Sequence, residues 1–486
     1  MNQLSGSDTL FLSMETQRTP QHVGGLSIYD PCTAPGGSVR FKDILRSTEE
    51  RLHLAKQFRQ RLVHSPLHLD YPYWFDDPDF DIEYHVRHIA LPRPGDWRQL
   101  CIQVARLQSQ PLDLTKPLWE FDVIEGLDNV KGIPKGCYAI LSKIHHAAID
   151  GQGGMNMSAA THSLSPTKQT VPAQEKWTAE PIPGYAKLLL KASKNTVLTP
   201  VKIAGLVKET IPSLLSTALS ILRKDISIAS NKVPRTRFDG VVSSQRVFEA
   251  KSFDLDTIRE MKNQAEKTTV NDVVLSIVSG AMKRYLEDKN ELPDESLVAF
   301  VPVSVRSEDE EHVTGNRVTA MTIPLATNIP DPVDRLKAIR ESSLAKKALT
   351  NAIGARKLAE FSNIMSPTMQ GLAMRLYTGF GLANKINFLA NLSITNVPGP
   401  QQPLYSVGAK LVTQYGLGPI FDGAGIMHIA GSYCGQLNIS VISCRSMMPD
   451  PGFYAECLQQ SFDELKAGLL KRPPAKREKR PQRKRV

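Results

Sequence analysis

The segment His145–Gly151, with the sequence His-His-Ala-Ala-Ile-Asp-Gly, constrains this 486-residue chain more than any other feature. The preceding run Cys137–Ile144 is mostly apolar and predicts a buried strand. Gly151–Gly154 contains three glycines and predicts that the strand has ended there. The two histidines are therefore expected where a strand leaves a sheet, a position at which functional sites are commonly assembled.

Adjacent residues on a strand point to opposite faces, so one histidine can face a cavity while the other packs inward. This arrangement argues against a metal site built from the pair. A neutral imidazole can remove a proton from an alcohol, amine or thiol near neutral pH. Asp150 follows His146 by four residues and can hold the ring or its loop. The alternative is a pair of structural histidines followed by a turn-forming Asp-Gly.

Three further segments accompany the histidine segment: Pro117–Trp119, Asn271–Leu275 and Thr395–Pro400. His-His-x-x-x-Asp-Gly is the signature of the superfamily that includes chloramphenicol acetyltransferase, carnitine acyltransferases and nonribosomal condensation domains. Together and in this order, the four segments resemble the bacterial wax ester synthase/diacylglycerol acyltransferase family over roughly residues 1–470. The family pattern usually has Ser at the position of Thr395, and both residues carry a hydroxyl.

The resemblance implies an α/β fold of two chloramphenicol-acetyltransferase-like subdomains that form a pseudo-dimer, with the active site between them. We expect an N-terminal subdomain over 1–165, a basic amphipathic helical linker over 166–240, a C-terminal subdomain over 241–470 and a disordered basic tail over 471–486. Local patterns predict helices over 41–62 and 96–110 and an edge strand over 71–75. They also predict a strand over 119–124 that pairs with 138–144.

The resemblance also implies an O-acyltransferase that moves a long-chain acyl group from acyl-coenzyme A to a diacylglycerol or fatty alcohol. The product is triacylglycerol or wax ester, and acyl-coenzyme A is a co-substrate, with no other cofactor and no metal expected. Direct transfer agrees with the absence of a Gly-x-Ser-x-Gly segment. The implied catalytic residues are His146 as general base, His145, Asp150 and Asn271. The implied substrate-binding residues are Pro117, Trp119, Gly151, Asp272, Asn396, Pro398 and Gly399.

Three of these residues have alternative roles. Trp119 can be an ordinary core residue, because burial is common for tryptophan. Asp272 can cap a helix that begins near it. Asp150 is expected to be mainly structural, and Arg306 is the expected structural partner of its carboxylate.

The charge distribution bears on the partners. Residues 471–486 contain nine Lys or Arg and one Glu, so this tail supplies +8 of the net charge of +10. The body is nearly neutral, which argues against nucleic acid, whereas a basic tail suits an anionic membrane or lipid-inclusion surface. No run approaches the ~20 apolar residues of a spanning helix. The six cysteines without Cys-x-x-Cys spacing favour the cytoplasm, with any membrane contact peripheral.

Two other functions remain open from the sequence. The chain can be a condensation-type acyltransferase that uses carrier-protein substrates, although no carrier-protein segment is attached. It can also be a non-catalytic scaffold on lipid inclusions. Acceptor preference, acyl chain length and oligomeric state are not determined by these patterns.

Overall fold

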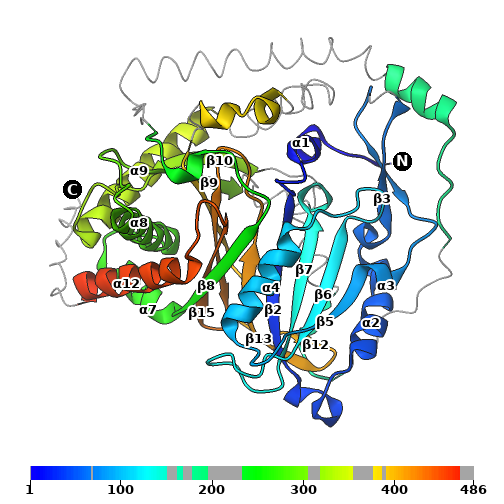
Figure 1. Ribbon diagram of the computed structural model, residues 1–486, viewed down its shortest axis with the longest axis horizontal. Coiled ribbons are helices and arrows are strands. Elements are labelled where there is room, and N and C mark those ends of the chain that lie inside the picture. Colours follow the sequence, from blue (N-terminus) through cyan, green and yellow to red (C-terminus); the bar gives the residue numbers. More distant parts are fainter. Residues whose placement is uncertain are drawn as a thin grey trace, which may run out of the picture.

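The computed structural model describes residues 2–66, 69–149, 161–167, 178–194, 233–304, 318–353, 376–385 and 390–470. Two six-stranded sheets form its two halves (Figure 1). The first sheet contains, in spatial order, β12 (Tyr405–Ser406), β13 (Ala409–Leu417), β2 (His22–Asp30), β7 (Tyr138–His145), β6 (Trp119–Glu125) and β5 (Val86–Ala90). The second contains β10 (Val318–Pro324), β9 (Val298–Ser304), β11 (Leu392–Val397), β14 (Ile426–Tyr433), β15 (Gln436–Cys444) and β8 (Arg246–Asp254).

A three-stranded sheet and several helices complete the described structure. The small sheet has the order β1 (Asn2–Gln3), β4 (Tyr73–Asp76) and β3 (Gln60–Val63). The helices of the first half are α1 (Gly6–Met14), α2 (Phe41–Glu49), α3 (Ile82–His85) and α4 (Trp97–Ser109). Those of the second half are α7 (Leu255–Gln264), α8 (Val270–Asp288), α9 (Pro332–Ile353) and α12 (Pro451–Leu470). This mixed architecture of two sheet-rich halves confirms the expected fold class.

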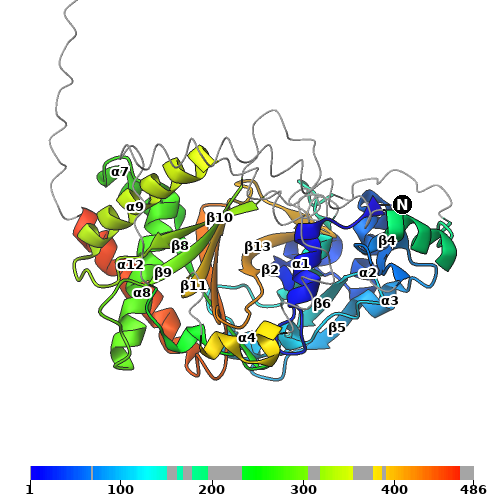
Figure 2. The same ribbon diagram turned by 90° about the horizontal axis from the view of Figure 1, so that it is seen from above.

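Strand β13 crosses from the second half of the chain into the first sheet, where it pairs antiparallel with β2. It also contacts β14 and β15 of the second sheet, so it links the two halves. Figure 2 shows the two sheets side by side, with β2 and β13 on the side of the first sheet that faces β9 and β11. Residues 405–417, which lie within the range expected for the second subdomain, therefore complete the first sheet.

Helix α4 packs in a hydrophobic cluster that contains residues from both halves. Asp96 caps its N-terminus by accepting a hydrogen bond from the Gln99 N–H, and its apolar face buries Leu100 and Val104. The same hydrophobic cluster contains Leu26 and Leu141 from the first sheet and Phe248 from β8. Burying one such side chain contributes about 1.5–3 kcal/mol relative to leaving it in water. Packing as well as strand pairing thus joins the halves.

Several local predictions can be compared with the observed elements. The helix over 96–110 and the pairing of 119–124 with 138–144 are confirmed by α4 and by the β6–β7 ladder. The helix over 41–62 is wrong beyond Glu49, because Leu52 and Phe58 reach the core from short 3₁₀ turns and β3 follows. The strand over 71–75 is not an edge strand, since β4 lies between β1 and β3.

Part of the predicted linker is described. Residues 185–194 are helical, and Leu188 packs with Tyr73 and Phe75 of the small sheet. The rest of the expected amphipathic region up to residue 232 and the basic tail lie outside the described residues. Within the described ranges, no helix combines the length and the apolar character that are needed to cross a bilayer.

The approach of β2 to β7 generates the first prediction. A Cβ atom added at Gly24 would lie 1.8 Å from the Ser142 carbonyl oxygen, a backbone atom that cannot move without distorting the ladder. We expect Gly24→Ala to destabilise the fold by about 2–4 kcal/mol and to lower the midpoint of thermal unfolding. Gly452→Ala is the matched control, because a Cβ there meets open space. Equal midpoints for the two variants would contradict the prediction.

Candidate active site

The backbone at the end of β7 fixes the positions of the two predicted histidines. The His145 N–H donates to the Leu118 carbonyl at 3.0 Å, and the His146 N–H donates to the Gln21 carbonyl at 2.8 Å. A short 3₁₀ turn, His146–Ala148, follows immediately. The two side chains lie in different surroundings, as alternation along a strand predicts: His145 is fully buried, and His146 lines a cavity.

The His145 side chain stabilises the turn through two hydrogen bonds. Its Nδ1 accepts a hydrogen bond from the Ala147 N–H at 3.0 Å. Its Nε2–H donates to Oε2 of Glu15 at 2.8 Å, since Nδ1 must be unprotonated to accept. Glu15 is the C-cap residue of α1, directly after Met14. The carboxylate therefore selects the tautomer of His145, and His145 in turn holds the backbone next to His146.

His146 is stacked against Phe11 of α1. The two ring centroids lie 3.6 Å apart with an interplanar angle of 12°. Burial lowers the pKa of His146 to about 4, and an interaction with its own backbone opposes the shift. The imidazole is consequently neutral at pH 7. A neutral imidazole can accept a proton, which is what a general base must do.

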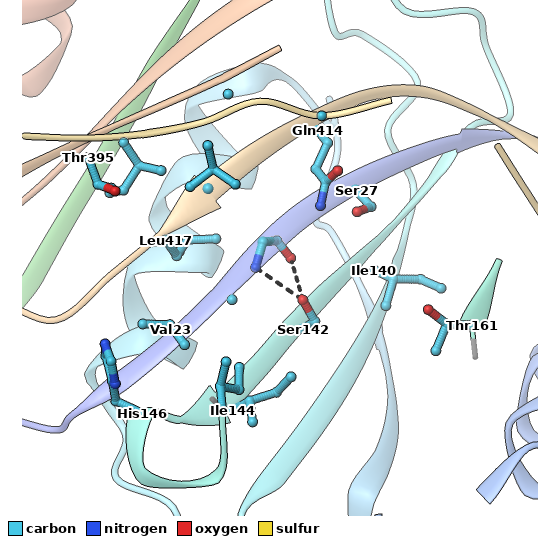
Figure 3. A pocket seen from close by; sticks show the side chains of 18 of the residues that line it. Val23, Ser27, Ile140, Ser142, Ile144, His146, Thr161, Thr395, Gln414 and Leu417 are labelled. Atoms are coloured by element: carbon cyan, nitrogen blue, oxygen red, sulfur yellow. Dashed lines mark hydrogen bonds between the residues drawn. The ribbon is translucent and has the colours of Figure 1, made fainter. Parts of the chain in front are cut away.

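The cavity beside His146 has a volume of about 900 Å³ and lies between the two sheets. Figure 3 shows His146 near one end of a row of side chains from β2 and β7, with Leu417 of β13 and Thr395 of β11 on another side. The first sheet contributes the lining residues Val23, Gly25, Ser27, Tyr29, Ile140, Ser142, Ile144, Gln414, Gly416 and Leu417. The second contributes Phe300, Pro302, Ser393, Thr395, Val397, Met427, Ile429 and Ala430. A largely apolar pocket of this size suits an alkyl substrate.

The Thr395–Pro400 segment reaches the cavity in part. Thr395, Val397 and Gly399 line it, whereas Asn396 and Pro398 are not among its lining residues. Alternation explains the difference for Asn396, which lies between two cavity-facing residues on β11. At Gly399 an added Cβ would lie 2.1 Å from the Ser432 carbonyl oxygen, so this turn requires glycine. The predicted substrate contacts of Asn396 and Pro398 stay predictions.

The Pro117–Trp119 segment is part of the core and does not line the cavity. The Trp119 indole N–H donates to the Phe58 carbonyl at 3.0 Å, and its ring stacks on His85 with centroids 4.5 Å apart. Trp119 contacts Phe121, which does line the cavity. Trp119 thus lies in a layer behind the cavity wall, and the implied substrate-binding roles of Pro117 and Trp119 stay predictions.

Asn271 and Asp272 lie in the first turn of α8, and neither lines the cavity. Asp272 forms a reciprocal capping box: its Oδ2 accepts from the Thr269 N–H at 2.9 Å, and its own N–H donates to Thr269 Oγ1 at 3.2 Å. The helix-cap alternative therefore describes Asp272, and the expected contact of Asn271 with the reacting centre stays a prediction.

Asp150, Gly151 and Arg306 lie outside the described residues, so the expected pairing of Asp150 with Arg306 stays a prediction. Within the described ranges, no group of three His, Cys, Asp or Glu side chains is arranged to hold a metal ion. Sequence reasoning missed Phe11 and Glu15. Their spacing of four residues suits one face of a helix, but nothing in the sequence connects that helix to a turn about 130 residues away.

Two sheets linked by β13, with a histidine-containing turn at the cavity between them, define a chloramphenicol-acetyltransferase-like fold. Residues 4–274 match the wax ester synthase/diacylglycerol acyltransferase catalytic domain, and residues 314–466 match the C-terminal domain of the same family. The chain belongs to this family. The first match extends well past the boundary that was expected near residue 165, in agreement with the continuous core.

Individual relatives agree with this assignment. The chain is 32% identical to a putative diacylglycerol O-acyltransferase of Mycobacterium tuberculosis, over 96% of this chain and 90% of that protein. It is also 32% identical to the O-acyltransferase WSD of Acinetobacter baylyi, over 92% and 93% of the two chains. Among solved structures, the wax ester synthase/diacylglycerol acyltransferase of Marinobacter aquaeolei VT8 matches with a TM-score of 0.68 and 27% identity, over 96% of this chain and all of that one.

A more distant match shows the fold alone. The starter condensation domain of rhizomide synthetase, in a variant complexed with C8-coenzyme A, has a TM-score of 0.54 and 14% identity. It covers 96% of this chain and 95% of that one.

The lowered pKa of His146 generates the second prediction. Because the base is active only when it is unprotonated, and its pKa is lowered to about 4, kcat/KM should stay constant as pH falls toward about 5 and then decline near pH 4. Thiol release can be followed with 4,4′-dithiodipyridine, which reacts in acid, while circular dichroism monitors folding at each pH. An acidic limb near the ordinary histidine value of about 6.5, with folding retained, would contradict the burial of this ring.

Proposed function

We propose that the protein transfers a long-chain acyl group from acyl-coenzyme A to the hydroxyl of a diacylglycerol or a fatty alcohol, producing triacylglycerol or wax ester. The observation that carries the proposal is a neutral His146 at the edge of a large, mostly apolar cavity. The family and the names of the relatives support the same chemistry. We propose that no cofactor takes part besides the co-substrate acyl-coenzyme A.

The reaction follows from the position of His146. Its Nδ1 is buried, and we therefore assign the role of proton acceptor to Nε2. Nε2 accepts the hydroxyl proton as the alcohol oxygen attacks the thioester carbonyl carbon, giving a tetrahedral oxyanion. The carbon–sulfur bond then breaks, and the proton passes from Nε2 to the departing thiolate. The ester and free coenzyme A are the products, and no covalent acyl-enzyme is needed.

The neighbouring residues position this base. Phe11 covers one face of the His146 ring, and the Glu15–His145 pair holds the backbone of the turn. Asp150 and Gly151 are proposed to shape the loop that follows, with Arg306 as the partner of the Asp150 carboxylate.

Loss of the base generates the third prediction. We expect His146→Ala to lower kcat for palmitoyl-coenzyme A with hexadecanol or a diacylglycerol by about 10²–10⁴-fold. The matched control is His88→Ala, because His88 is partly exposed, pairs with Glu125 and lies outside the cavity. Thiol release and chromatography of the ester product provide the measurement. Undiminished transfer by a folded His146→Ala variant would contradict the assignment, and no transfer by the unmodified protein with either acceptor would favour the carrier-protein or scaffold alternative.

We also propose that the protein acts on the cytoplasmic face of a membrane or on lipid inclusions, as a peripheral protein. The helix over 185–194 supports this proposal. Its Leu188 is buried against the small sheet, whereas Tyr185 and Leu190 are 64% and 75% exposed. Lys187, Lys191 and Lys194 lie on the same helix. Exposed apolar residues interspersed with lysines are typical of a helix that lies in a membrane interface.

The fourth prediction concerns this helix. The double change Tyr185→Ser and Leu190→Ser should weaken partitioning onto phosphatidylglycerol-containing vesicles by about tenfold or more, because two apolar side chains no longer enter the interface. Co-sedimentation measures the bound fraction. Leu164→Ser is the control, since Leu164 is 64% exposed but lies off the helix. Equal partitioning of the double variant and the control would contradict docking through residues 185–194.

A further inference from the structure

One part of the cavity wall is a continuous row on β2 and β7. Val23, Gly25, Ser27 and Tyr29 alternate along β2, and all four line the cavity. The register places Ile144 opposite Val23, Ser142 opposite Gly25 and Ile140 opposite Ser27. In Figure 3 this row leads from His146, past Val23 and Ile144, to Ser27 and Ile140, with Thr161 beyond them. The row, hereafter the β2–β7 strip, has His146 near one end.

In the middle of the strip, the Ser142 hydroxyl and the Gly25 backbone form hydrogen bonds with each other. The Ser142 hydroxyl donates to the Gly25 carbonyl at 3.1 Å, and its oxygen accepts from the Gly25 N–H at 3.0 Å. A substrate lying there meets the methyl groups of Val23, Ile140 and Ile144 instead of free donors. Such a surface favours a hydrocarbon chain, because the Ser142 hydroxyl and the Gly25 backbone keep each other as partners when water leaves.

The far end of the strip is different in character. The Tyr29 hydroxyl is 2.8 Å from Nε2 of His162, and the Thr161 hydroxyl is 3.1 Å from Nδ1 of the same ring. All three side chains line the cavity. The Tyr29 ring is held by stacking on Tyr138, with centroids 5.4 Å apart. The hydrogen-bonded Tyr29–His162 pair therefore lies at the end of the row of aliphatic side chains.

Two polar residues of the α2 region also line the cavity. They are Ser47 and Arg51, in and just after α2, and the Arg51 guanidinium donates to the Ser47 carbonyl at 3.0 Å. An alkyl chain gains nothing from contact with these groups, so its methyl end is more stable against the aliphatic side chains of the strip.

The length of the strip can be compared with that of a substrate. Tyr29 lies six residues beyond Val23, which at about 3.3 Å per residue corresponds to roughly 20 Å. An extended hydrocarbon chain advances roughly 1.25 Å per carbon, given C–C bonds of about 1.5 Å. The strip therefore accommodates about 16 carbons between the His146 end and the Tyr29–His162 pair.

We propose that the β2–β7 strip holds the linear alkyl chain of one substrate, and that the Tyr29–His162 pair limits the length of that chain. The inference rests on the proposed acyl transfer and adds a specificity determinant to it. The chain belongs either to the acyl-coenzyme A or to the acceptor, and both have the same chemistry along the strip.

The test uses the full-length protein with two variants that change the strip in opposite directions. Ser27→Phe fills it partway along, and Tyr29→Ala removes its end. Ser27→Ala and Tyr29→Phe are the controls, because they change polarity with little change in volume. One assay series varies acyl-coenzyme A from C8 to C20 with hexadecanol fixed, and the other varies the alcohol with palmitoyl-coenzyme A fixed. The midpoint of thermal unfolding is measured for each variant.

In one of the two series, we expect Ser27→Phe to raise kcat/KM for C10 relative to C16 by about tenfold, because Ser27 lies only ~13 Å beyond Val23. Tyr29→Ala should raise the value for C20 relative to C16 in the same series. The series that responds identifies which substrate occupies the strip. Both controls should keep the optimum at the length preferred by the unmodified protein.

Two outcomes would overturn the proposal. One is an unchanged length preference of folded Ser27→Phe in both series. The other is an equal loss at every length with a raised KM for acyl-coenzyme A, which would place the pantetheine arm along the strip. If Tyr29→Ala does not fold, the chain-length preference of Ser27→Phe still tests the proposal. Turnover by the unmodified protein separates these results from a failure of the proposed acyl transfer itself.

Discussion

The pairing of β13 with β2 is the constraint on which the rest of the structure depends. It joins residues 409–417 to residues 22–30, and the same β13 contacts β14 and β15 of the second sheet. An irregularity between Leu411 and Thr413 shifts the register, so that Gln414 lies opposite Ser27 and Gly416 opposite Gly25. This shift directs Gln414 and Gly416 toward the cavity. Without the pairing, the cavity would lose one wall and its link to the second sheet.

The histidine turn depends on this frame and on α1. Glu15 accepts a hydrogen bond from His145, His145 accepts one from the Ala147 N–H, and Phe11 covers the His146 ring. Leaving a buried donor such as the His145 Nε2–H without its acceptor costs about 1–3 kcal/mol, so the turn resists rearrangement. The same burial keeps His146 neutral. The enclosure of His146 between α1 and the cavity therefore determines both its position and its protonation state.

The sequence predicted the β7 strand, its pairing with β6 and the different environments of His145 and His146, because strand alternation is a local property. It offered two roles for Trp119 and two for Asp272, and only the structure shows that Trp119 packs behind Phe121 and that Asp272 caps α8. Residue type near a motif does not reveal which face of an element reaches a cavity. Phe11 and Glu15 were missed for a related reason, since their partners lie about 130 residues further along the chain.

The sequence by itself determined the elements with strong periodicity, the family and the identity of the candidate base. Each of these depends on contiguous residues or on motifs in a fixed order. Only the tertiary structure decided that residues 405–417 join the first sheet, that α1 covers His146, and that the β2–β7 strip ends at Tyr29 and His162. These features arise from contacts between segments far apart in the chain, and their energies depend on three-dimensional packing that local patterns do not encode.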